Sequence, residues 1–163
     1  MTLATHAVIG AAVVVSLPGW PLSGFMAAIA SHFLLDALPH WDYQLRSRRE
    51  DEQEPLNDDL ILGRDFLVDL LKIFFDISLG VLLAALLFYR LDGSIGGWLI
   101  TLGIIGGILP DLLQFVYFKF RREPLTSLQR FHHFIHTKYK LKGQPLRGVL
   151  TQATLVMLIW FVL

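Results

Sequence analysis

The chain has 163 residues, no cysteine and a formal net charge of zero, and 54% of its residues are hydrophobic while only 17% are charged. The lack of cysteine excludes disulfides and thiolate ligands, and the balanced charge gives no electrostatic reason to expect a nucleic-acid partner. So apolar a composition is typical of an integral membrane protein. We therefore expect one membrane-embedded domain over residues 1–163, with the lipid bilayer as its main partner.

Five apolar stretches cover roughly residues 3–17, 22–38, 66–91, 94–118 and 147–163. A helix needs about 20 apolar residues to cross a bilayer, so the third and fourth stretches are long enough. The other three are short and must tilt little, thin the bilayer or pack as partly buried elements. The sequence thus predicts an all-α fold, a polytopic transmembrane bundle of four to five helices.

Turn signals at 18–21 and 91–93 join these stretches into two antiparallel hairpins. Solvated linkers are expected at about 40–65 and 119–146. If every stretch spans, the N-terminus and both linkers share one side of the membrane, and that side carries nearly all lysines and arginines while the other carries Arg90 alone. The positive-inside rule makes the basic side cytoplasmic.

Two GxxxG spacings, Gly93 with Gly97 and Gly103 with Gly107, lie in and just before the fourth stretch. Such pairs let helix backbones approach closely. Glycine is also simply frequent in membrane helices, and both interpretations stay open at this stage.

His32, Asp36 and His40 are spaced four residues apart, so their side chains line one face near the end of the second helix. Pro39 is expected to end or bend that helix and to place His40 and Asp42 at its rim. A lone buried histidine is more often a satisfied core residue than a ligand. Three ionisable groups on one face of an apolar helix instead favour a site inside the bundle.

Ligand-type side chains occur at a similar depth in other helices. Counted from the cytoplasmic end, His32, Asp76 and Asp111 lie roughly 10–15 Å deep at about 1.5 Å per residue, and His6 enters from the same side. Asp111 follows Pro110, whose kink is tolerated where it is buried or lines a polar cavity. Asp76 could belong to the site or could pair with Lys72.

Asp65 and Asp69 lie nearer to water than Asp76 and are expected to be solvated. The second linker carries His132, His133 and His136. As a helix, this segment places His132 and His136 on one face. Its aromatic and lysine residues also suit an amphipathic helix at the membrane interface, but that explanation does not account for three histidines.

Histidine and carboxylate ligands without thiolate suit a divalent metal, zinc before manganese or iron. The candidate ligands exceed the needs of one tetrahedral ion, so either two ions share the pocket or some residues support the others. The candidates are His6, His32, Asp36, His40, Asp76, Asp111, His132, His133 and His136. Asp36 or Asp42 could act as general base in hydrolysis.

The function predicted from these residues is metal-dependent hydrolysis of an ester, phosphoester or amide in a membrane-associated, lipid-like substrate. The alternative is a non-catalytic metal-binding protein that holds or transports an ion, or a small interaction module whose polar cluster locks the helices together. A transporter would need polar groups continuing to the opposite face, and the outer halves of the helices have almost none.

At these residues the chain resembles a family of uncharacterised membrane-bound, metal-dependent hydrolases, grouped under a domain of unknown function and typified by a bacterial inner-membrane protein. The resemblance rests on Thr5-His6, the block from Ala30 to Asp42 (ASHFLLDALPHWD) and the segment from Ile108 to Gln114 (ILPDLLQ), with a late histidine block at 132–136. The chain lacks the HRGxTHS-like motif that family members often carry ahead of the block that corresponds to Ala30–Asp42. The resemblance implies a multi-pass protein of the bacterial cytoplasmic membrane with hydrolase activity.

Overall fold

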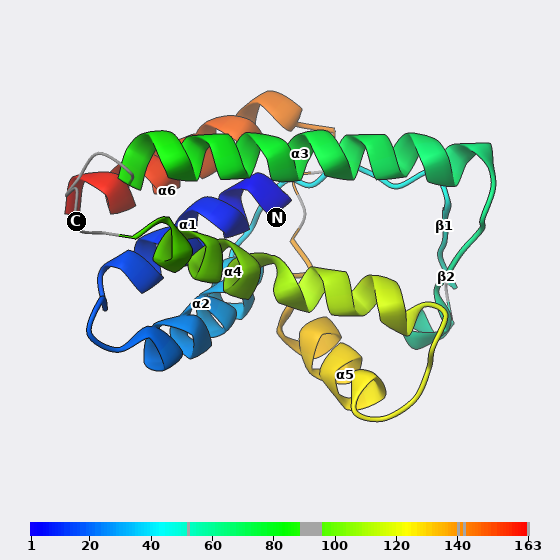
Figure 1. Cartoon of the computed structure of the whole chain (residues 1–163). Helices are drawn as coiled ribbons and strands as arrows, with labels where there is room; N and C mark the ends of the chain where they lie inside the picture. The colour runs from blue at the N-terminus through cyan, green and yellow to red at the C-terminus, as the bar shows by residue number, and fades with distance from the viewer. Residues whose placement is uncertain (52, 89–95, 140, 142, 163) are drawn as a thin grey trace.

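The computed structural model describes residues 1–51, 53–88, 96–139, 141 and 143–162, and these form a helical bundle (Figure 1). In chain order the elements are α1 (Leu3–Val15), α2 (Pro21–Asp36), β1 (Arg48–Arg49), a 3-10 turn (Pro55–Asn57), β2 (Asp59–Leu60), α3 (Arg64–Phe88), α4 (Gly97–Tyr117), α5 (Leu125–Ile135) and α6 (Pro145–Val162). The prediction of an all-α fold is confirmed. Five of the helices correspond to the five apolar stretches, and α5 is an additional helix in the second linker.

Helix α1 forms the centre of the bundle. Twelve of its 13 residues are buried, and it packs against α2, α3, α4 and α6. The helix is rich in alanine, valine and glycine, and His6 is its only ionisable side chain. It is therefore one of the short apolar helices that pack inside the protein.

Close backbone contact between α1 and α4 depends on three glycines. A Cβ atom added at Gly10 would lie 2.9 Å from the Cα atom of Gly107, and one added at Gly103 would lie 2.5 Å from the Cα atom of Ala11. Gly103 and Gly107 thus use their GxxxG spacing as a helix-packing motif. The other spacing includes Gly93, which lies outside the described residues.

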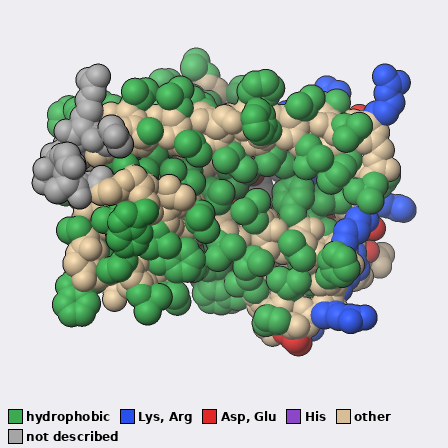
Figure 2. Space-filling view, viewed as in Figure 1, with side chains coloured by type: hydrophobic (Ala, Val, Ile, Leu, Met, Phe, Trp, Pro, Cys, Tyr) green, Lys and Arg blue, Asp and Glu red, His purple; other side chains and the backbone are tan. Residues whose placement is uncertain are grey.

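Three helices are long and apolar enough to cross a membrane: α3, α4 and α6. The outward face of α3 exposes large apolar side chains such as Leu71, Phe74 and Phe75, and Figure 2 shows hydrophobic side chains over most of one face of the molecule. Lysines and arginines gather at the end where β1 and β2 lie (Figures 1 and 2). These features suit a membrane protein with one basic end.

The structure describes one of the two predicted hairpin turns. Residues 16–20 connect α1 to α2, which runs back alongside it (Figure 1), as the turn signal predicts. The second predicted turn, at 91–93, lies outside the described residues. On either side of it, α3 and α4 run in opposite directions (Figure 1).

The first linker is ordered rather than simply solvated. Strands β1 and β2 pair antiparallel, with Arg48 opposite Leu60. Asp69 of α3 is 1% exposed and accepts hydrogen bonds from the backbone N–H and the hydroxyl of Ser47, at 2.7 and 2.8 Å. One prediction for this helix was wrong, because Asp69 is buried rather than solvated. Of the two roles left open for Asp76, pairing with Lys72 is not observed, since Lys72 pairs with Asp69 at 2.8 Å.

The second linker contains α5, which begins after Pro124 and ends at Ile135. It packs against α4 and α2. Its inward face buries Gln129 and His132, while Phe134 is exposed. The helix is amphipathic as predicted, and its polar inward face turns histidine toward the bundle.

Candidate metal centre

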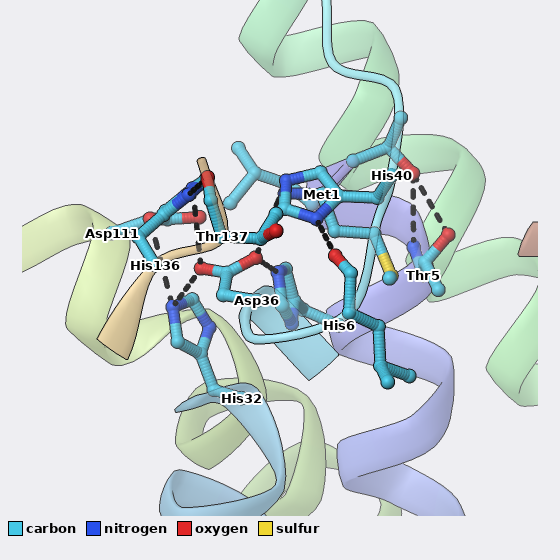
Figure 3. Close-up of polar contacts among 12 residues, drawn as sticks. Met1, Thr5, His6, His32, Asp36, His40, Asp111, His136 and Thr137 are labelled. Carbon is cyan, nitrogen blue, oxygen red and sulfur yellow. Dashed lines mark hydrogen bonds and ion pairs between the residues drawn. The ribbon is translucent and has the colours of Figure 1, made fainter. Parts of the chain in front are cut away.

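The carboxylate of Asp36 is the centre of a buried histidine cluster (Figure 3). Asp36 is the last residue of α2 and is 1% exposed. Its Oδ2 atom lies 3.2 Å from Nε2 of His32 and 3.0 Å from Nε2 of His132. Its Oδ1 atom lies 3.2 Å from Nε2 of His6 and 2.9 Å from the amino group of Met1. One carboxylate therefore contacts groups from α1, α2 and α5.

Three further side chains complete the surroundings of this carboxylate. Nε2 of His40, from the linker after α2, lies 3.8 Å from Oδ1, and Nε2 of His136, the residue that ends α5, lies 3.9 Å from Oδ2. Asp111 of α4 places Oδ1 3.7 Å from Nε2 of His32. The arrangement brings five histidines and two aspartates from distant parts of the chain into one cluster.

Local sequence explains how these side chains converge. His32 and Asp36 are four residues apart on the inward face of α2, and the same spacing puts His132 and His136 on one side of α5. Helix α2 ends at Asp36, three residues before Pro39, so the chain turns and His40 comes back toward the cluster. Helix α1 packs against α2, and the ring of His6 stacks on that of His32 with 3.9 Å between the ring centres.

Backbone carbonyl groups fix the orientation of three of the histidine rings. Nδ1 of His32 lies 2.7 Å from the carbonyl oxygen of Gly107, and Nδ1 of His40 lies 2.8 Å from that of Leu38. Nδ1 of His136 lies 3.3 Å from the carbonyl oxygen of Thr137. A carbonyl oxygen can only accept, so Nδ1 donates in each case. A neutral imidazole then presents a lone pair at Nε2. All three Nε2 atoms point toward Asp36.

This orientation places acceptor atoms against one another in a buried site. His32 Nε2 lies 3.5 Å from Nε2 of His132, in addition to its short distances from the two carboxylates. Lone pairs and negative oxygens at such distances repel unless a proton or a cation lies between them. The cluster therefore has the electrostatic character of a cation site.

The distances also match tetrahedral coordination. Ligands about 2.0–2.1 Å from a zinc ion are about 3.3–3.4 Å from one another. Among His32, Asp36, Asp111 and His132, five ligand-to-ligand distances lie between 3.0 and 3.9 Å. A second group, made of Asp36, His40 and His136, is also compact enough to hold an ion. The buried cluster could hold a metal ion, and Asp36 belongs to both groups.

Two predicted ligands lie elsewhere. Asp76 accepts hydrogen bonds from the backbone N–H groups of Leu3, at 2.7 Å, and Ala4, at 3.2 Å. It thus caps the N-terminus of α1, where a negative charge is favourable. His133 is exposed beside the cluster and borders a cavity. Neither belongs to the two groups that could hold an ion.

A pair of adjoining cavities, of about 740 and 550 Å³, connects the cluster with the surface. Both are lined by Met1, Asp42, Arg48, Asp111 and Gln114. The side chain of Asp42 is exposed to this space, yet the surrounding protein limits its hydration, and this partial burial raises the pKa of its carboxyl group to about 6. Asp42 is therefore an acid–base group facing the cavity next to the cluster.

The sequence analysis missed a residue that positions His6. Gln152 of α6 is 5% exposed, and its Oε1 atom accepts from the backbone N–H of Thr2 and from the hydroxyl groups of Thr2 and Thr5, at 2.9–3.1 Å. Its Nε2 atom donates to the carbonyl oxygen of Trp41 at 2.9 Å. A single amide side chain in an otherwise apolar helix, such as Gln152, indicates a buried hydrogen-bond partner.

Comparison with protein-family models, with curated proteins and with solved structures found no match to this chain.

Proposed function

We propose that the chain is a metal-dependent hydrolase of the membrane, with zinc as the preferred ion and with Asp36 among the residues that would hold it. The observation that carries this proposal is the orientation of the histidines: carbonyl groups hold Nδ1 of His32, His40 and His136, and every Nε2 atom faces the same carboxylate. Outer partners of this kind are typical of metal-ligating histidines. Nitrogen and oxygen donors suit zinc, manganese and iron.

The residues divide into three roles in this proposal. His32, Asp36, Asp111 and His132 would hold one ion, and His40 and His136 together with Asp36 would hold a second. His6 contacts Asp36 from α1 and stacks on His32, so it supports both ligands. A bound ion would polarise the scissile group and lower the pKa of water in the site.

Asp42 is the candidate general base, because Asp36 is surrounded by ligands while Asp42 faces the cavity. In hydrolysis, its carboxylate accepts a proton from the attacking water and then gives that proton to the leaving group. The scissile ester, phosphoester or amide bond breaks, and water supplies the oxygen and the two hydrogens of the products.

Topology is a second part of the proposal. The end with the basic residues is assigned to the cytoplasm, in agreement with the bacterial cytoplasmic membrane that the block from Ala30 to Asp42 implies by resemblance. Because the chain has no cysteine, single cysteines report topology directly. Arg49→Cys should react with an impermeant thiol reagent only after the cell is opened, and Gly19→Cys should react in intact cells; the reverse pattern would refute the assignment.

Measurement of substrate turnover tests the proposed hydrolase activity. Purified protein, stripped with a chelator and reloaded with zinc, is incubated with phospholipids, prenyl phosphates and peptides. We expect metal-dependent release of product from one of these substrate classes. Asp42→Asn should lower turnover at least 100-fold while zinc content stays unchanged. Glu50→Gln, which changes another acidic residue of the same cavity, should have little effect on turnover.

The other outcomes have definite meanings. If zinc binds stoichiometrically but no substrate turns over, the chain is a metal-binding protein without hydrolase activity. If turnover survives removal of all metal, the proposed mechanism is wrong.

A further inference from the structure

The larger cavity lies between the first linker, which contributes residues from 41 to 50, and the two membrane-length helices α3 and α4. Its wall includes Ile73 of α3, together with Phe115 of α4 and Phe118, which ends that helix. Figure 2 shows a hollow between α3 and α4 on the hydrophobic face of the molecule. A hydrocarbon chain could therefore lie against this apolar part of the wall, while Asp42, Arg48 and Glu50 belong to the polar part of the same cavity.

The smaller cavity has a different lining. It adds Gln129, His133 and Lys138 to the residues that the two cavities share. Lys138 is exposed at its rim. Amide, imidazole and ammonium groups can all donate hydrogen bonds, so this part suits a ligand rich in acceptor oxygens.

Arg48 lies at the junction of the two cavities. Its Nε and Nη2 atoms donate to Oδ2 of Asp58 at 3.1 and 2.6 Å, and its guanidinium group lies 5.9 Å from the ring centre of Phe118. These contacts hold the group in a fixed position. Within the described residues, its Nη1 atom has no hydrogen-bond partner. A fixed guanidinium group with a remaining donor is well suited to a phosphate oxygen.

Asp111 joins this junction to the metal centre, since it lines both cavities and lies 3.7 Å from His32. Asp42 and Glu50 also line the larger cavity. Because these carboxylates offset Arg48, an anionic group needs the positive charge of bound metal to be held strongly.

We propose that this double cavity binds a membrane lipid with a phosphate headgroup. The inference rests on the proposed metal function and names its substrate class. The hydrocarbon chain lies between α3 and α4 against Ile73 and Phe115, and the phosphate lies between the metal centre and Arg48, with Lys138 at the rim. Phosphoester hydrolysis is then the reaction that the site performs.

The test measures binding of dodecyl phosphate to zinc-loaded protein in phosphatidylcholine nanodiscs, with zinc content determined on the same samples. Dodecanol and inorganic phosphate serve as comparison ligands that carry only one half of the molecule. We expect dodecyl phosphate to bind at least tenfold more tightly than either, and its affinity to fall at least tenfold when zinc is removed. Equal affinity for dodecanol would overturn the phosphate assignment, and binding of inorganic phosphate as tight as that of dodecyl phosphate would overturn the lipid assignment.

Two matched pairs of variants locate the ligand. Ile73→Trp fills the apolar cavity and should weaken binding at least tenfold, while Leu79→Trp, on the exposed face of the same helix, should not. Arg48→Gln should weaken binding of dodecyl phosphate but not of dodecanol, and the exposed neighbour Arg49 changed to Gln should leave both unchanged. Unchanged binding in Ile73→Trp or in Arg48→Gln, with zinc retained, would refute the proposed location.

The zinc measurement separates the two proposals. A parent protein without zinc would contradict the proposed metal function by itself. Dodecyl phosphate binding in that sample, and its response to Ile73→Trp, would still decide whether the cavity takes a lipid phosphate.

Discussion

Replacing Asp76 tests whether this half-buried acid is a helix cap or a metal ligand. Its carboxylate accepts hydrogen bonds from the backbone N–H groups of Leu3 and Ala4, both of which are buried. Asp76→Ala leaves two such groups without acceptors. Each buried unsatisfied group costs about 1–3 kcal/mol, and loss of a helix cap costs about 0.5–2 kcal/mol. We expect the free energy of unfolding to fall by about 2 kcal/mol, which is the lower limit for two unsatisfied groups and the upper limit for a lost cap.

Asp76→Asn keeps one acceptor oxygen and loses the negative charge at the N-terminus of α1. We expect it to lower the free energy of unfolding by about 1 kcal/mol. Because Asp76 belongs to neither group that could hold an ion, metal stoichiometry should be unchanged in Asp76→Asn. The assay combines denaturant unfolding in mild detergent, followed by tryptophan fluorescence, with elemental analysis of the same preparations.

Asp65→Asn is the matched control, since Asp65 lies on the same helix and is exposed. It should change stability by less than about 0.5 kcal/mol. If Asp76→Asn kept its stability but lost metal, the assignment of Asp76 as the cap of α1 would be refuted, and the residue would be a ligand.

Three further predictions concern packing and ligation. Gly107→Ala places a Cβ atom inside contact distance of the carbonyl oxygen of His6 and should destabilise the protein by about 3 kcal/mol or more. Gly97→Ala is the control, because a Cβ atom there has nothing within 4 Å. Equal yields of folded protein for both variants would contradict the close contact of α1 with α4. His132→Ala should weaken zinc binding at least tenfold and His133→Ala should not, as measured by competition with a chelating dye; equal losses would show that the exposed histidine is also a ligand. Asp69→Ala removes the acceptor of both Ser47 hydrogen bonds and should lower the free energy of unfolding by about 2 kcal/mol. It should also speed tryptic cleavage in the first linker, and an unchanged cleavage rate would show that Asp69 does not hold that linker.

Local periodicity was enough to predict most of the cluster. The spacing of His32, Asp36 and His40 puts their side chains on one face of any helix, and the apolar residues around them require that face to point inward. The same reasoning applies to His132 and His136. The expected meeting of these groups with Asp111 depended further on the topology count, which placed ligand-type side chains of four separate helices at a similar level.

Contacts made by docked linkers and by helix ends could not be predicted in this way. The pairing of Lys72 with Asp69 depends on Ser47, a residue of the linker whose position the helical pattern does not determine. The capping of α1 by Asp76 depends on where the short helix α1 begins beside α3. Both involve hydrogen bonds between segments far apart in the sequence, for which spacing along one helix gives no information.

The most direct test of the account is an anomalous difference map from crystals of the zinc-loaded protein, recorded at the zinc absorption edge. We expect strong peaks beside Asp36, one among His32, Asp111 and His132 and one between His40 and His136, and we expect both to disappear in Asp36→Asn. Protein that is saturated with zinc in solution but shows no peak beside Asp36, or whose peaks persist in Asp36→Asn, would contradict it.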